Sequence, residues 1–194
     1  MFVSFEGVDG TGKSTIIENI QKKLSKEYKV VIYNEPSNQY GRTAKFGDPG
    51  LKKLDLINLW WTDRRFELNK LENQDYDIVL ADRYYDSTFV YLNEYLDNIM
   101  VQQNYNHNYF LKPDITFVLH CPTEVLIERI KERVTTDVFE SLEVDLIDLR
   151  NKIFQQLSLI NHFERNIKCI NSNQDIDQVC NDCLQYLLAD LSRA

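Results

Sequence analysis

Short apolar runs and longer amphipathic stretches alternate along the chain. Five runs are β-rich and almost continuously apolar, a pattern typical of strands buried on both faces; they lie at 1–6, 29–34, 76–82, 114–121 and 166–171. Helical spacing of apolar residues occupies the stretches between and after them, at 14–26, 51–73, 86–103, 123–133, 141–163 and 174–190. Repeated strand–helix–strand units predict an α/β fold with a parallel sheet and helices on both sides.

Composition narrows the class of protein. The chain has 194 residues and 43% hydrophobic content, which predicts a single domain over 1–194. A net charge of −8 disfavours a general nucleic-acid binder. No run approaches the roughly 18 apolar residues of a membrane span, and the opening run is too short for a signal peptide. Cysteines 121, 169, 180 and 183 suggest reduced thiols and a cytoplasmic protein, with Cys180 and Cys183 buried in a helix.

The sequence GVDGTGKS, residues 7–14, fits the phosphate-binding pattern G-x-x-x-x-G-K-[ST] between a strand and a helix. Its glycines allow backbone N–H groups to surround phosphate oxygens, and the helix N-terminus adds positive partial charge. Lys13 is placed to reach the β and γ phosphates, and Ser14 to bind Mg²⁺. A plain strand–turn–helix would explain neither the second glycine nor the lysine, so we predict nucleoside triphosphate binding.

A second motif is IVLADRYYDST, residues 78–88. Asp82 follows four apolar residues, which places its carboxylate at the carboxyl end of a buried strand, where ligands bind in open α/β sheets. It could orient Mg²⁺ or its waters, and Arg83 could grip a phosphate with two hydrogen bonds. The alternative is a helix cap at Asp82 and a surface cation at Arg83.

Two helical stretches carry further candidates. Trp60 and Arg64 are four residues apart on one helix face and could stack on and hydrogen-bond a planar base, although tandem tryptophans are more often core residues. Arg129 and Arg133 also share a face, before the loop VTTDVFE, and could close a lid on transferring phosphate. A solvated charged face is the alternative for this pair.

Taken together, these motifs resemble the thymidylate kinase family. The similarity covers nearly the whole chain and rests on FEGVDGTGKST, the Glu35-Pro36 pair, TDRR, DRYYDST followed by Tyr91, and KPDITFVL. It implies a five-stranded parallel P-loop sheet with a mobile lid at about 129–141, usually in a homodimer. It implies transfer of the γ-phosphoryl group from ATP–Mg²⁺ to dTMP, with neither nucleic acid nor membrane as partner.

The resemblance also implies roles for individual residues. The expected catalytic residues are Lys13, Arg83, Asp9 and Arg133. ATP would contact Gly7, Asp9, Gly10, Thr11, Gly12, Lys13, Ser14, Thr15 and Arg129. The acceptor dTMP would contact Asp9, Glu35, Tyr40, Arg42, Trp60, Arg64, Arg83, Ser87, Thr88 and Tyr91. Magnesium would be held by Ser14 and Asp82.

Some positions depart from the family pattern. Gly10 follows the acidic loop residue, as in the subgroup with a basic lid, yet VTTDVFE contains no cation. Arg133, Lys131 or Arg129 would then supply the lid charge. Leu92 replaces a common glutamine, and His120 stands where the strand often ends in aspartate. Two alternatives stay open: a broader deoxynucleotide or deoxynucleoside kinase, and a non-enzymatic nucleotide-sensing module.

Overall fold

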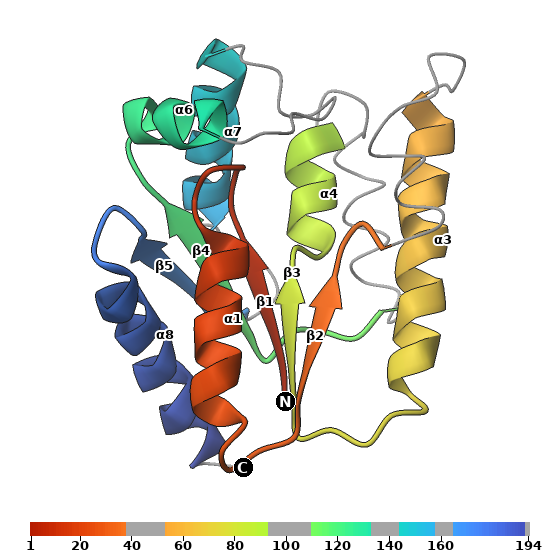
Figure 1. Ribbon diagram of the computed structural model, residues 1–194. Helices are drawn as coiled ribbons and strands as arrows, with labels where there is room; N and C mark the ends of the chain where they lie inside the picture. Colours follow the sequence, from red (N-terminus) through yellow and green to blue (C-terminus); the bar gives the residue numbers. More distant parts are fainter. Residues whose placement is uncertain (38–52, 93–109, 133–143, 158–164, 193–194) are drawn as a thin grey trace.

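A computed structural model describes residues 1–37, 53–92, 110–132, 144–157 and 165–192. Within them a parallel sheet of five strands has the order β2-β3-β1-β4-β5 (Figure 1). The strands are β1 (Phe2–Glu6), β2 (Val30–Asn34), β3 (Ile78–Asp82), β4 (Ile115–His120) and β5 (Ile167–Asn171). Each lies within a run that the apolar pattern predicted, so the predicted α/β class and parallel sheet are confirmed.

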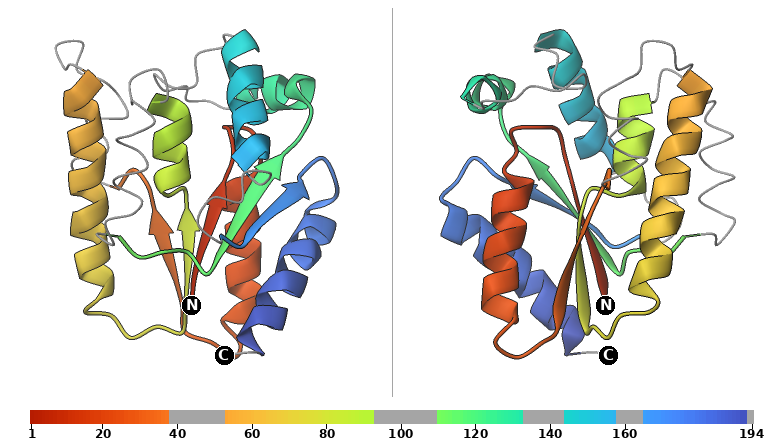
Figure 2. Two further views of the ribbon diagram at one scale, coloured as in Figure 1. Left: turned by 180° about the vertical axis from the view of Figure 1, so that it is seen from behind. Right: turned by 45° about the vertical axis from the view of Figure 1, so that its right-hand side comes forward.

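Helices cover both faces of the sheet (Figures 1 and 2). One face is covered by α1 (Lys13–Leu24) and α8 (Ile176–Leu191). The other is covered by α3 (Lys53–Leu71), α4 (Tyr85–Leu92) and α7 (Val144–Leu157), and α6 (Thr123–Lys131) lies beyond the carboxyl end of β4. Every helix lies within or overlaps a stretch predicted from its helical spacing. Among the described helices, none combines the length and apolar character that a membrane crossing requires.

Side chains of the central strand β1 alternate between the two faces. Val3 and Phe5 are fully buried in the core beneath α1 and α8. Phe2 packs on the opposite side with residues of α3, and Ser4 bonds Thr116 of β4. A strand buried on both faces needs apolar side chains on both, as the near-continuous apolar runs indicated.

The two cysteines of the CNDC sequence are core residues. Cys180 and Cys183 are free thiols and fully buried where α8 packs on the sheet and α1. Burial raises the pKa of the Cys183 thiol well above its usual range, so it stays a neutral apolar group. The prediction of buried helix cysteines is therefore confirmed.

Core burial predicts the effect of truncating an aromatic side chain. Phe117 of β4 is fully buried against Phe5, so Phe117→Ala is expected to lower the free energy of unfolding by about 3–5 kcal/mol. Phe66 of α3 is 46% exposed, and Phe66→Ala should cost less than about 1 kcal/mol. Urea unfolding of the two variants measures the difference, and equal losses would contradict this account of the core.

Candidate active site

The loop between β1 and α1 has the backbone of a phosphate-binding loop. Gly7, Gly10 and Gly12 have φ angles of 139°, 87° and 85°, which L side chains rarely adopt. A Cβ at Gly7 would also overlap the carbonyl oxygen of Leu119, and one at Gly10 would lie 3.0 Å from the carbonyl oxygen of Leu126. These glycines therefore let the loop lie directly against β4 and α6.

Lys13, the first residue of α1, folds back over this loop. Its Nζ donates to the carbonyl oxygens of Gly7 at 2.9 Å and Val8 at 3.0 Å, and it is within 3.4 Å of the Thr11 hydroxyl. Burial, followed by the nearby charge of Arg83, lowers the pKa of the Lys13 ammonium to about 8. A phosphate group would offer this cation a stronger partner than the carbonyl oxygens do.

Ser14 and Asp82 meet at the carboxyl edge of the sheet. The register pairs Phe5 with Asp82, so β3 ends beside the start of the loop. The Ser14 hydroxyl donates to Asp82 Oδ2 at 2.6 Å. A hydroxyl and a carboxylate are oxygen donors of the kind that Mg²⁺ prefers, so these residues fit the predicted magnesium site. Thr15, one residue further along α1, is exposed on the helix.

Arg83 joins the loop to the acceptor side of the site. It has a φ of 70°, the left-handed region that non-glycine residues rarely occupy. Its Nη1 donates to the Gly7 carbonyl oxygen at 3.1 Å, and its Nη2 to Asp9 Oδ1 at 2.5 Å. Burial opposes the charge of Arg83, but the Asp9 carboxylate and the other acidic groups nearby together outweigh burial and hold the pKa above the usual value.

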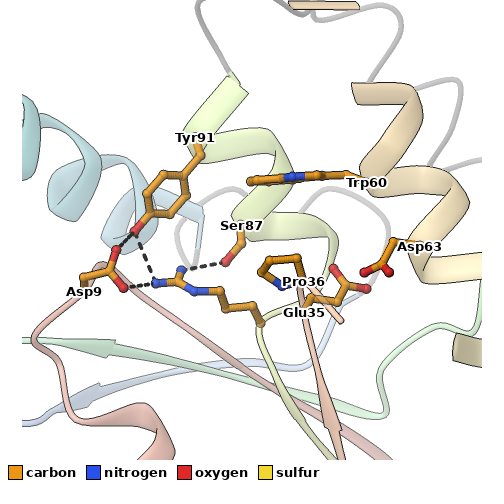
Figure 3. A pocket seen from close by; sticks show the side chains of 8 residues that line it. Asp9, Glu35, Pro36, Trp60, Asp63, Ser87 and Tyr91 are labelled. Atoms are coloured by element: carbon orange, nitrogen blue, oxygen red, sulfur yellow. Dashed lines mark hydrogen bonds and ion pairs between the residues drawn. The ribbon is translucent and has the colours of Figure 1, made fainter. Parts of the chain in front are cut away.

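Tyr91 and Ser87 of α4 complete this polar cluster (Figure 3). The Tyr91 hydroxyl donates to Asp9 Oδ2 at 2.8 Å, and Ser87 Oγ accepts from Arg83 Nη1 at 3.1 Å. Burial raises the pKa of the Tyr91 phenol, which keeps it protonated as a donor. The loop, the end of β3 and the helix α4 thus converge on one guanidinium group.

The cluster borders a pocket with about 450 Å³ of empty space, part of it open to solvent. Its walls are Asp9, Glu35, Pro36, Trp60, Asp63, Arg83, Ser87 and Tyr91. In Figure 3 the Trp60 ring lies across one side of the pocket with a face toward Pro36 on the other. A planar base could enter between these two surfaces, with its phosphate directed toward Arg83.

Arg64 lies deeper than Trp60 and is 1% exposed. Its Nε and Nη2 bind the two oxygens of Glu35, each at 2.6 Å, and Nη2 also donates to Thr88 Oγ1 at 2.7 Å. Burial disfavours its charge, but Glu35 overcomes this and raises the pKa. The sequence predicted a helix face shared with Trp60, and the structure adds that this guanidinium holds Glu35 in the pocket wall.

Arg129 of α6 reaches the phosphate loop from the other side. Its Nη1 donates to the Gly10 carbonyl oxygen at 3.2 Å, and its Nη2 to the Ser172 carbonyl oxygen at 3.3 Å. Ser172 directly follows β5, so one side chain links the loop, α6 and the end of β5. The predicted contacts Tyr40, Arg42 and Arg133, and most of the predicted lid 129–141, lie outside the described residues.

Known proteins with the same motifs identify the family. A sequence model of the family described as thymidylate kinase matches residues 5–183. A protein of Sulfolobus acidocaldarius named "Probable thymidylate kinase" is 31% identical over 188 residues, covering 91% of each chain. This chain belongs to the thymidylate kinase family. It is accordingly a phosphotransferase, as the sequence resemblance implied.

Solved structures of similar proteins share the fold of this thymidylate kinase family member. The thymidylate kinase of Ehrlichia chaffeensis has a TM-score of 0.74 at 22% identity, covering 96% of this chain and 98% of that one. A deoxyadenosine kinase of M. mycoides, solved with dCMP and dCDP, has the same TM-score at 21% identity, covering 97% and 100%. At this identity both similarities establish the fold alone.

Three residues of the site were not given a role from the sequence. Asp63 lines the pocket and accepts the backbone N–H of Ser37 at 2.6 Å. Pro36 forms the wall opposite Trp60, and the buried Glu6 bonds Ser87 beneath the pocket. All three belong to sequence motifs that indicated the family: TDRR, the Glu35-Pro36 pair and FEGVDG. Membership of these motifs is the signal that could have identified them as site residues.

The loop geometry distinguishes two glycines. Gly7→Ala adds a Cβ that overlaps the Leu119 carbonyl, whereas the nearest atom to a Cβ at Gly12 lies 3.8 Å away. Both variants carry the strain of a positive φ, so Gly7→Ala should lose at least about 1 kcal/mol more free energy of unfolding than Gly12→Ala. Thermal unfolding of the nucleotide-free proteins checks this order, and the reverse order would show that the loop relaxes freely.

Proposed function

We propose that this chain transfers the γ-phosphoryl group of ATP to dTMP, giving dTDP. The observation that carries the proposal is the place of Arg83, which contacts the phosphate loop through Gly7 and Asp9 and also lines the Trp60 pocket. A donor phosphate on the loop and an acceptor phosphate in the pocket would therefore meet at one cation. Positioning two reactants and neutralising their charge is the main work of a phosphoryl transferase.

On the donor side, Lys13 would exchange its carbonyl partners for the β and γ phosphates of ATP. The loop backbone from Gly7 to Thr15 would surround the phosphates, and Arg129 would pack near the adenine. Ser14 and Asp82 would hold Mg²⁺, which when bound supplies positive charge to the phosphate oxygens. The close pairing of these two oxygen donors supports that assignment.

On the acceptor side, the thymine ring would lie between Trp60 and Pro36. Its phosphate would bind Arg83, while Tyr91 and Asp9 would border the sugar. Thr88 and Arg64 would contact the edge of the base. Because Arg64 is already bonded to Glu35 and Thr88, Glu35 would share in that contact. Tyr40 and Arg42 are further proposed acceptor contacts. The apolar stacking surfaces beside a cationic end support an acceptor nucleotide rather than a free phosphate.

Other proposed features follow from family membership and, for the lid charge, from the absence of cations in VTTDVFE. We propose that Arg133 supplies the catalytic lid charge, with Lys131 second, and that the lid spans about 129–141. A homodimer in the cytoplasm is the expected state. A broader deoxynucleotide or deoxynucleoside kinase stays the second candidate, because Leu92 and His120 depart from the family pattern.

Removing the loop cation tests the donor side. Lys13→Ala is expected to lower kcat/KM by about 10² or more, because a charge on the transferring phosphates is lost. Lys22→Ala, an exposed lysine in the last turn of the same helix, is the matched control and should retain activity. Steady-state kinetics with ATP and dTMP measure both, and near-normal turnover by a folded Lys13→Ala protein would refute the mechanism.

A substrate panel tests the acceptor. We expect activity to fall in the order dTMP, dUMP, then dCMP and UMP well below, with thymidine and dGMP poor acceptors. Trp60→Leu should raise the KM for dTMP by about tenfold with little effect on the KM for ATP, because a stacking surface is lost. Trp61→Leu is the matched control, since Trp61 is not among the residues lining the pocket. Equal activity on dTMP and dCMP would favour the broader kinase.

A further inference from the structure

Glu6 is a carboxyl group buried beneath the proposed acceptor site. It is the last residue of β1 and is fully inaccessible to solvent. Its side chain lies on the face of the sheet that α4 covers and bonds two residues there. Burying a carboxyl group is unfavourable unless its oxygens form hydrogen bonds. The hydrogen-bond partners of Glu6 therefore indicate its role.

The two partners of Glu6 both follow Arg83 closely in the sequence, at the start of α4 and just before it. Glu6 Oε1 accepts the backbone N–H of Tyr84 at 2.9 Å, and Oε2 lies 2.6 Å from the Ser87 hydroxyl. Ser87 Oγ in turn accepts from Arg83 Nη1 at 3.1 Å. Glu6 therefore holds both the peptide N–H that directly follows Arg83, whose backbone is strained, and the hydroxyl that accepts from the Arg83 guanidinium.

We propose that Glu6 is a positioning residue that fixes Arg83 and Ser87 toward the acceptor phosphate. It is not among the residues lining the pocket, so it acts through these two side chains rather than on substrate. This inference rests on the proposed function, because it assumes that Arg83 binds the acceptor phosphate. It adds a fully buried residue at the end of β1 to a site otherwise built from the phosphate loop, Arg83, α3 and α4.

Several charged groups face Glu6. Asp86 of α4 is nearby and is paired with Arg165, whose Nη1 lies 2.8 Å from Asp86 Oδ1. Arg83, Glu35 and Lys13 also act on it through charge. Burial, and then the Asp86 carboxylate, raises the pKa of Glu6 to about 8, so the neutral acid predominates at pH 7.

The neutral acid suits an anion site. When Oε2 carries the proton, it can donate to Ser87 Oγ instead of accepting from it, which leaves the Ser87 proton available to the pocket that Ser87 lines. Above about pH 8 the ionised carboxylate accepts that proton instead and adds a negative charge below the acceptor phosphate. Glutamine at this position would imitate the neutral acid, accepting from Tyr84 and donating to Ser87, but would not ionise.

These contacts specify the experiment, which uses the acceptor that the unmodified chain phosphorylates fastest in the substrate panel. At pH 7, Glu6→Ala should raise the KM for that acceptor by about tenfold or more and leave the KM for ATP nearly unchanged. Glu6→Gln should stay within about twofold of the unmodified protein, because its amide keeps both hydrogen bonds. Ser87→Ala should raise the same KM, and Glu6→Ala with Ser87→Ala should be no worse than the poorer single variant.

A pH series gives a second readout. Between pH 6.5 and 9 the acceptor KM of the unmodified protein should rise as Glu6 ionises, and that of Glu6→Gln should rise less. Lys13 lies on the donor side in both proteins, so its own titration is expected in the KM for ATP, which is measured in the same series. Ser4→Ala is the control, since Ser4 also lies on β1 and bonds Thr116 at 2.9 Å; it should lower stability without changing either KM.

Three outcomes would overturn the proposal. They are an unchanged acceptor KM in folded Glu6→Ala, an equal rise in both KM values, or identical pH series for the unmodified protein and Glu6→Gln. If Glu6→Ala does not fold, the pH comparison decides. Failure of dTMP as the preferred acceptor would instead refute the proposed function, because the Glu6 measurements use whichever acceptor the panel identifies.

Discussion

The ion pair between Arg83 and Asp9 connects the two halves of the site. Asp9 belongs to the loop after β1, and Arg83 directly follows β3, the neighbouring strand. Parallel strands that end at the same edge bring these residues together without any long-range folding of loops. The same guanidinium also reaches the Gly7 carbonyl and Ser87, so the phosphate loop and helix α4 share one point of attachment.

Three guanidinium groups in or beside the site are each matched by a carboxylate in the described part of the chain. Arg83 pairs with Asp9, Arg64 with Glu35 and Arg165 with Asp86. Removing one partner of a buried ion pair strongly destabilises the folded protein, because the other charge is left uncompensated. A chain with net charge −8 attracts anionic nucleotides only weakly at long range. The ion pairs hold cations inside the site, where they can act on a nucleotide at short range. Substrate phosphates would then compete with carboxylates for cations that are already oriented.

Much of this arrangement could be predicted from the sequence, for identifiable physical reasons. Continuous apolar runs located the strands, and the pattern from Gly7 to Ser14 fixed the loop, because few residue types satisfy its backbone geometry. The position of Asp82 after a buried strand placed it at the edge of the sheet. The four-residue spacing of Trp60 and Arg64 placed both on one side of α3. Spacing within a helix cannot reveal a partner from another segment, such as Glu35 for Arg64. The role of Glu6 could not be predicted from local sequence because it depends on Ser87 of α4, 81 positions later.

The central strand of the sheet, β1, is synthesised before both strands that pair with it. Its neighbours β3 and β4 begin at Ile78 and Ile115. Until those residues leave the ribosome, β1 exposes two unpaired edges and an apolar sequence, features that favour non-native association. The helix α8, which packs on α1, is made later still. Both edges of β1 can therefore be paired in the nascent chain only after β4 has been synthesised, well past the middle of the sequence.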